Sequence, residues 1–139
     1  MRTFKVTTLS LACLFSVLGT PLSAFAHGED KPGPHGGIVR MPGALHTEVV
    51  ASGAQAFNVY LLDINFKEPT TDRSSLKVTL KKGDQSESIP CAASGEFFRC
   101  TSNSADALSA GELIVEANRN GVQGVPISYP LPLSAYSPR

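Results

Sequence analysis

The clearest structural signal in this sequence is LKVTLKKGDQSESI, residues 76–89. Apolar and polar side chains alternate from Leu76 to Lys81, which is the period of a β-strand with one buried face. Gly83-Asp84 follows as a two-residue turn signal and favours a hairpin into residues 85–89. The stretch therefore predicts two antiparallel strands with one side facing an apolar core.

Segments of the same kind recur along the chain. Turn signals separate them about every 8–12 residues, as in a β-sandwich, and there is no helical period of any length. Asn120-Gly121 is the strongest hairpin signal in the sequence. We expect short strands at residues 38–41, 45–50, 57–64, 76–81, 85–89, 97–101, 113–117 and 122–129. The predicted fold class is all-β: one antiparallel, immunoglobulin-like β-sandwich of about seven strands over residues 38–139.

Strand alternation also predicts the two faces of each strand. The side chains expected in the core are Leu76, Val78, Leu80, Leu113 and Val115. Those expected to be exposed are Lys77, Thr79 and Glu116. In segment 45–50, one face carries Leu45, Thr47 and Val49, and the other carries His46, Glu48 and Val50.

The N-terminus has the order of a secretory signal peptide. Arg2 and Lys5 are followed by an apolar run over residues 6–18, and Ala24 and Ala26 form a small-residue cleavage site. A membrane anchor is the alternative, but the run is shorter than the roughly 20 residues that span a bilayer. We therefore expect residues 1–26 to be removed, a mature chain that begins at His27, and a periplasmic location.

The predicted mature chain is a single domain of modest size. It keeps ten basic and twelve acidic residues, so nucleic acid is not an expected partner. It also has no stretch long and apolar enough to span a membrane. Its two cysteines, Cys91 and Cys100, predict a disulfide because paired cysteines in an exported chain are usually oxidised. The alternative is a thiolate metal site, which neither a close Cys-x-x-Cys nor a third thiol supports.

All three histidines lie within residues 27–46. The first two, His27 and His35, belong to a Gly/Pro-rich arm over residues 27–37, and His46 lies in an expected strand. Imidazole is the commonest protein ligand for transition metals, so the cluster suggests a metal site. The alternative is that these are solvated or backbone-bonded side chains, with the glycines and prolines only shaping a turn.

Cleavage after Ala26 would give His27 a free α-amine beside its imidazole. Such a chelate with a second imidazole suits Cu(II). Glu48 could supply an oxygen ligand or orient His46, and the thioether of Met41, unless it only packs, would favour Cu(I). The candidate metal ligands are His27, His35, His46, Glu48 and Met41, with copper expected and zinc or nickel possible.

Two segments, GPHGGIV at residues 33–39 and HTEVV at residues 46–50, carry a resemblance. Together they resemble the small N-terminal domain of periplasmic adaptor subunits from heavy-metal efflux pumps, over residues 27–64. The resemblance implies metal handling and carries over to His35, His46 and Glu48. This chain lacks the helical hairpin and lipoyl-like parts of an adaptor, and the Cys91–Cys100 pair is not part of the pattern.

The sequence therefore predicts a periplasmic metal-binding protein that buffers an ion or delivers it to an export system, with an efflux or transport component as a possible partner. The alternative is an exported adhesion or assembly module that binds another protein, with incidental histidines. We do not expect an enzyme, because the mature chain has no Gly-x-Ser-x-Gly elbow, phosphate loop or acid–base constellation.

Overall fold

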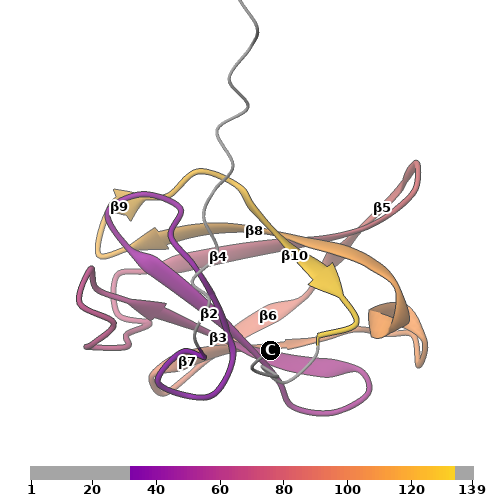
Figure 1. The fold of residues 1–139 in the computed structure, drawn as a ribbon, viewed down its shortest axis with the longest axis horizontal. Helices are drawn as coiled ribbons and strands as arrows, with labels where there is room; N and C mark the ends of the chain where they lie inside the picture. The colour runs from indigo at the N-terminus through magenta and orange to yellow at the C-terminus, as the bar shows by residue number, and fades with distance from the viewer. Residues whose placement is uncertain (1–31, 134–139) are drawn as a thin grey trace, which may run out of the picture.

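The computed structural model describes residues 32–133. The predicted signal peptide and His27 lie outside the described residues. Within them the chain folds into two antiparallel sheets that face each other, and a single 3-10 turn, η1 (Ala107–Ser109), connects them at one end (Figure 1). No helix in the described range is long and apolar enough to cross a membrane.

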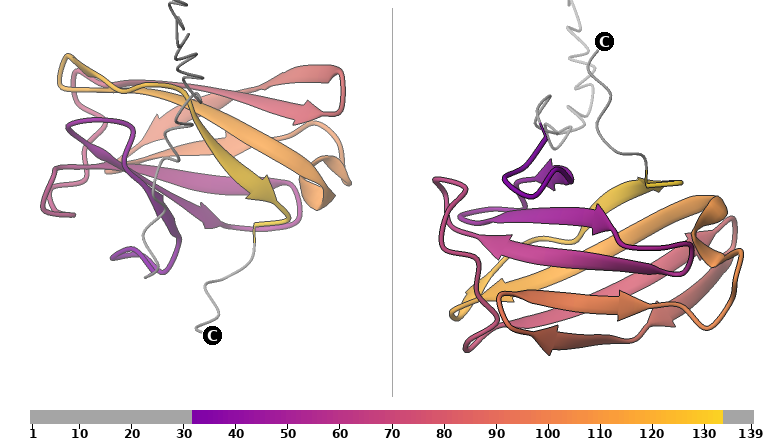
Figure 2. Two further views of the ribbon diagram at one scale, coloured as in Figure 1. Left: turned by 45° about the horizontal axis from the view of Figure 1, so that its top comes forward. Right: turned by 90° about the horizontal axis from the view of Figure 1, so that it is seen from below.

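The first sheet has the strand order β1-β2-β3-β7-β6, and the second has the order β10-β8-β4-β5 with β9 also pairing with β8. Figure 2 shows the two layers edge-on. The strands of the first sheet are β1 (Ile38–Arg40), β2 (His46–Ala51), β3 (Ala56–Leu62), β6 (Cys91–Ser94) and β7 (Phe97–Thr101). Those of the second are β4 (Ser75–Lys82), β5 (Gln85–Ile89), β8 (Gly111–Arg119), β9 (Val122–Gln123) and β10 (Ile127–Leu131).

The predicted antiparallel β-sandwich is confirmed, although the strands number ten rather than about seven. One strand, β6, was not among those expected, and one expected strand is divided into β9 and β10. Pro90 separates β5 from β6 and carries the chain from the second sheet to the first. Residues 124–126 interrupt the returning strand: Asn118 pairs with Gln123, but Val115 pairs with Ile127, so one extra residue forms a bulge.

Both predicted hairpin turns are confirmed. Lys82 pairs with Gln85 across Gly83-Asp84, and Arg119 pairs with Val122 across Asn120-Gly121. Asn120 and Gly121 have φ of 51° and 85°, as a type I′ turn requires.

The core lies between the sheets and follows the predicted alternation. Val78, Leu80, Leu113 and Val115 are buried, whereas Leu76 is only half-buried because it lies near the start of β4, at the end of the sandwich. On the outer side of the second sheet Lys77 is exposed and its Nζ contacts Oε1 of Glu116 at 2.9 Å. Glu116 and Thr79 are half-buried rather than exposed, because cross-strand neighbours cover part of each.

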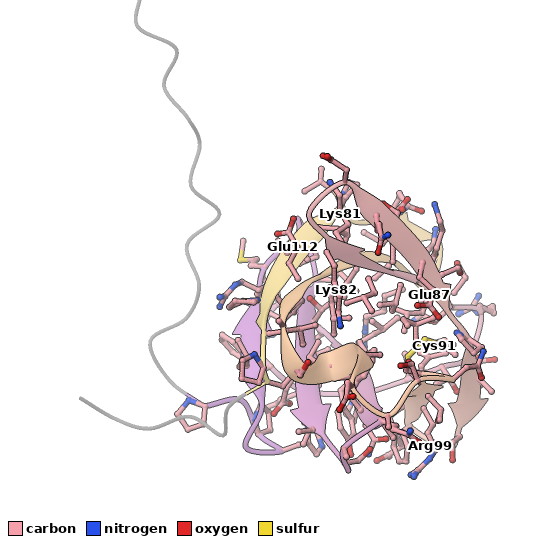
Figure 3. All side chains as sticks on the ribbon, turned by 90° about the vertical axis from the view of Figure 1, so that its right-hand side faces the viewer. Lys81, Lys82, Glu87, Cys91, Arg99 and Glu112 are labelled. Atoms are coloured by element: carbon pink, nitrogen blue, oxygen red, sulfur yellow. A yellow bond between two sulfur atoms is a disulfide. The ribbon has the colours of Figure 1, made fainter. Side chains whose placement is uncertain are left out.

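The predicted disulfide is confirmed, with Sγ atoms of Cys91 and Cys100 2.01 Å apart. The two residues are direct register partners on β6 and β7, so the bridge joins neighbouring strands of one sheet. Figure 3 shows Cys91 at the end of the molecule where the β4–β5 hairpin carries Lys81, Lys82 and Glu87. There Nζ of Lys82 donates to the carbonyl oxygen of Asp106, beside η1.

Candidate functional site

Strand β2 is buried on both faces. Thr47 and Val49 face the core between the sheets, and His46 and Glu48 lie on the opposite, outer face of the first sheet. The exposed fraction is 2% for His46 and 0% for Glu48, although no second sheet covers this side. Two loops cover it instead, residues 32–37 over Glu48 and residues 63–67 over His46.

The carboxylate of Glu48 holds the first loop. Its Oε1 accepts the backbone N–H groups of His35 and Gly37, both at 2.9 Å, and its Oε2 lies 2.8 Å from Nδ1 of His35. A buried carboxylate is stable only where such donors replace its water. Residues 32–37 of the predicted arm are therefore a fixed turn, in which Pro32 also bridges to Ile38.

Glycines make this close approach possible. A Cβ on Gly33 would lie 2.3 Å from Cδ of Glu48, and a Cβ on Gly37 would lie 2.4 Å from the carbonyl oxygen of Val49. Gly36 has φ of 80°, a conformation that side-chain-bearing residues disfavour. The glycines around His35 therefore allow the backbone of the turn to contact the Glu48 carboxylate directly.

The imidazole of His35 is oriented on two sides. It stacks on Tyr60, with ring centroids 3.7 Å apart and planes 6° apart. Because a carboxylate accepts the Nδ1–H, the neutral ring keeps its lone pair on Nε2. The side chain is 29% exposed, so the imidazole is accessible from water. Burial raises the pKa of Tyr60, and the Glu48 and Glu96 carboxylates add to this effect.

The imidazole of His46 is held in a similar way. Its Nδ1 lies 3.0 Å from the carbonyl oxygen of Asp63, which can only accept a hydrogen bond, and its ring stacks on Phe66 with centroids 3.9 Å apart. The neutral ring therefore also keeps its lone pair on Nε2. In the described part of the chain no group hydrogen-bonds Nε2 of either His35 or His46.

The side chain of Asp63 shapes the loop that carries Phe66. Its Oδ1 accepts the backbone N–H groups of Lys67 and Asn65, both at 2.8 Å. The Lys67 N–H bond is the main cause that holds the pKa of Asp63 below its usual value. The loop thereby brings a carbonyl oxygen and an aromatic ring onto His46.

The structure brings three of the predicted site residues to one sheet face: His35, His46 and Glu48. Glu48 hydrogen-bonds His35, not His46 as the sequence suggested for an orienting role. Met41 directly follows β1 and is 46% exposed. Among residues 32–133 no group of three or more His, Cys, Asp or Glu side chains is arranged to hold a metal ion.

Sequence reasoning missed Tyr60, Phe66 and the carbonyl oxygen of Asp63. Tyr60 is the register partner of Glu48 on β3, and only the register between β2 and β3 reveals this. Residues Asp63 and Ile64 were expected to continue a strand, but they begin the covering loop.

Searches among protein-family models, curated proteins and solved structures find no match to this chain.

Proposed function

We propose that this chain is an exported metal-binding protein, with copper as its preferred ion, that buffers the ion or delivers it to an export system in the periplasm. The observation that carries the proposal is the environment of His35 and His46. Each ring directs Nδ1 at an acceptor and keeps Nε2 as a donor atom. Metal-ligating histidines almost always donate their other ring N–H to a carboxylate or a backbone carbonyl.

In this proposal Glu48 is a positioning residue, because its oxygens already accept three hydrogen bonds in the turn. The donor atoms are then Nε2 of His35 and of His46, completed by His27, whose α-amine and imidazole would add nitrogen ligands after signal cleavage. A nitrogen-rich set suits Cu(II), and the thioether of Met41 would favour Cu(I). Zinc and nickel are the competing ions.

The export part of the proposal is supported by the signal-like N-terminus and by the Cys91–Cys100 disulfide, which is typical of an oxidising compartment.

One observation favours the alternative, a module that binds another protein. Large apolar side chains are exposed near one end of the sandwich, and the backbone N–H of Val125 donates to the carbonyl oxygen of Pro42, which brings Val125 near Met41. Among residues 32–133 the exposed large apolar side chains are Met41, Ile64, Val122 and Val125. An apolar surface of this kind can mark a protein interface.

Metal titration of the mature protein distinguishes the two functions. Residues 27–139 would be mixed with Cu(II), Zn(II) or Ni(II), and thermal unfolding followed. An ion that binds only the native state raises the free energy of unfolding by about 2.7 kcal/mol at a hundredfold excess over its Kd. We expect the largest shift with Cu(II). No shift with any of the three ions would exclude the metal-binding function and leave the protein-binding module.

The Glu48→Gln variant tests the positioning role. The amide group can still accept from the backbone N–H groups, but its NH2 would face Nδ1 of His35 and require the tautomer with Nε2 protonated. We expect Cu(II) affinity to fall by about 10–100-fold, the usual effect of removing a partner that orients a metal-binding histidine. Glu116→Gln, a matched change on the second sheet, should leave affinity unchanged. Equal affinities for the two variants would remove Glu48 from the site.

A further inference from the structure

The two imidazoles differ in their access to water. The His35 side chain is 29% exposed, whereas His46 as a whole residue is 2% exposed. Phe66 stacks over the His46 ring at 3.9 Å with the planes 21° apart. An ion arriving from solvent can therefore reach His35 directly, but has almost no free surface to approach on His46.

The backbone of the covering loop adopts an unfavourable conformation where it carries this ring. Phe66 has φ of 62°, in the left-handed region that residues with a Cβ rarely adopt. Glu68, two residues later, has φ of 51°. Hydrogen bonds from Asn65 and Lys67 to the Asp63 carboxylate hold the loop in this shape. Strained residues held by surrounding bonds are often found at functional sites.

Movement of the Phe66 side chain alone would leave the loop backbone in place. Hydrogen bonds to the Asp63 carboxylate hold that backbone, and the guanidinium of Arg119 on β8 donates to the carbonyl oxygen of Glu68 at 2.6 Å. Ile64, Asn65, Lys67 and Glu68 are exposed, and Phe66 is the half-buried residue among them. The other contacts of His46 are the carbonyl oxygen of Asp63, at the start of the loop, and the sheet itself, where Leu62 on β3 is its fully buried register partner. Displacement of Phe66 is therefore the least disruptive way to expose the His46 ring.

We propose that Phe66 is a gate over His46, so that metal binds in two steps, first to His35 and then, once the Phe66 ring has moved aside, to His46. This inference rests on the proposed metal-binding function and adds the regulation of its site. Phe66 is a positioning residue here, because it acts through the imidazole that it covers. Its ring would slow both the capture and the release of the ion at His46.

Stopped-flow mixing of the mature protein with Cu(II) tests the gate. The chain has no tryptophan and three tyrosines, and Tyr60 stacks on His35, so quenching of tyrosine fluorescence reports the arrival of the ion. We expect a fast phase whose rate rises with Cu(II) concentration and a slower phase whose rate does not. His46→Ala should lack the slow phase.

Phe66→Ala should speed the slow phase by about tenfold or more, or merge it with the fast one. Phe97→Ala is the matched control, because Phe97 contacts Tyr60 on the same face, with centroids 5.3 Å apart, and does not stack on His46. It should keep the wild-type slow phase. Phe66→Leu retains an apolar side chain without the flat ring and should give an intermediate rate if Phe66→Ala fails to fold.

The possible outcomes distinguish gating by Phe66 from metal binding itself. A folded Phe66 variant that keeps the wild-type slow phase, or a wild-type reaction with one concentration-dependent phase, would overturn the gate while the metal site stands. Absence of any quenching or melting shift at stoichiometric Cu(II) would instead overturn the proposed function, and the gate with it.

Discussion

Glu48 is the residue on which the outer face of the first sheet depends. It is fully buried, and its two oxygens accept from two backbone N–H groups and an imidazole. One side chain thus anchors the turn over residues 32–37 and selects the tautomer of His35. The imidazole proposed as a metal ligand and the carboxylate that orients it come from residues 13 positions apart in sequence.

Tyr129 links the two sheets on the other side of β2. Its hydroxyl donates to the carbonyl oxygen of Thr47 at 2.8 Å and lies 2.5 Å from Oγ1 of Thr47. Burial raises the pKa of this tyrosine well above its ordinary value, against the smaller opposing effect of the Thr47 hydrogen bond. The neutral phenol is therefore part of the folded state.

A raised pKa means that the folded state binds this proton more tightly than the unfolded state. The resulting stability is complete below about pH 10, the ordinary tyrosine pKa, and is lost as the pH rises above it. Tyr129→Phe should be less stable at neutral pH by about 1 kcal/mol, through the lost hydrogen bonds. Urea unfolding of both proteins from pH 7 upward should show the two curves converging above pH 10. A constant difference across that range would contradict the assigned cause.

The sequence identified the ligand candidates but not their surroundings. Histidine and glutamate types are visible in the chain, and alternation correctly put His46 and Glu48 on one strand face. The contact between Glu48 and His35 was not predictable in this form, because it depends on how a Gly/Pro-rich turn folds back onto the sheet. Phe66 was missed because its place over His46 depends on a left-handed backbone in a loop.

At the scale of elements, we expect the turn over residues 32–37 to lose less stability from a strained backbone angle than from an added methyl group that collides with Glu48. Gly33→Ala would place a methyl group 2.3 Å from Cδ of Glu48, a side chain that is fully buried. We expect this variant to lose about 2–4 kcal/mol of stability and most of its Cu(II) affinity, because the Glu48–His35 contact must break.

Gly36→Ala is the matched comparison. No atom lies within 4 Å of the added Cβ, so only the φ of 80° opposes the change. The cost should be about 1–2 kcal/mol, with Cu(II) affinity largely kept. Denaturant unfolding and metal competition measure both quantities. Equal loss of affinity in the two variants would mean that the turn, rather than the Glu48 contact, supports the site.

The disulfide secures β6 at the edge of the first sheet. Replacement of both Cys91 and Cys100 by serine should lower stability by about 2–4 kcal/mol, because the bridge restricts the unfolded chain. Metal affinity should be unchanged, since β6 is at the opposite edge of the sheet from β1. Alkylation of the native, unreduced protein should detect neither of these thiols, and stoichiometric labelling of both would contradict the pairing.

Strand positions were predictable wherever one face alone is buried, as in β4 and β8, because alternation then marks the core side. Strand β2 is covered on both faces. Its polar side chains suggested an exposed face, so the burial of that face was not predictable. The change of sheet at Pro90 was not predictable either. A proline marks a strand end but does not say to which sheet the next strand belongs.

At the scale of the whole molecule, the residues that stabilise the sandwich and the residues of the candidate site lie on opposite faces of the first sheet. The core between the sheets contains aliphatic and aromatic side chains, and the candidate site lies on the outer face of one sheet under two short loops. The two imidazoles are therefore held in fixed orientations outside the core, where the buried hydroxyls of Thr47 and Tyr129 hydrogen-bond each other.

Processing of the whole chain decides the role of His27. If the mature chain begins there, addition of one residue before His27 converts its α-amine to an amide, which no longer offers a lone pair. We expect the extended protein to bind Cu(II) about tenfold or more weakly in a competition titration. Equal affinities would exclude the amine as a ligand and leave His35 and His46.

The central claim is that a metal ion binds at the outer face of the first sheet through His35 and His46. Substoichiometric Cu(II) added to the mature protein broadens nuclear magnetic resonance signals close to the bound paramagnetic ion. We expect the imidazole signals of His35 and His46 and the ring signals of Tyr60 to disappear first. The methyl signals of Ile89, buried on the edge strand β5 of the other sheet, should persist. Loss of signals elsewhere first, or uniform broadening over the whole protein, would contradict the central claim.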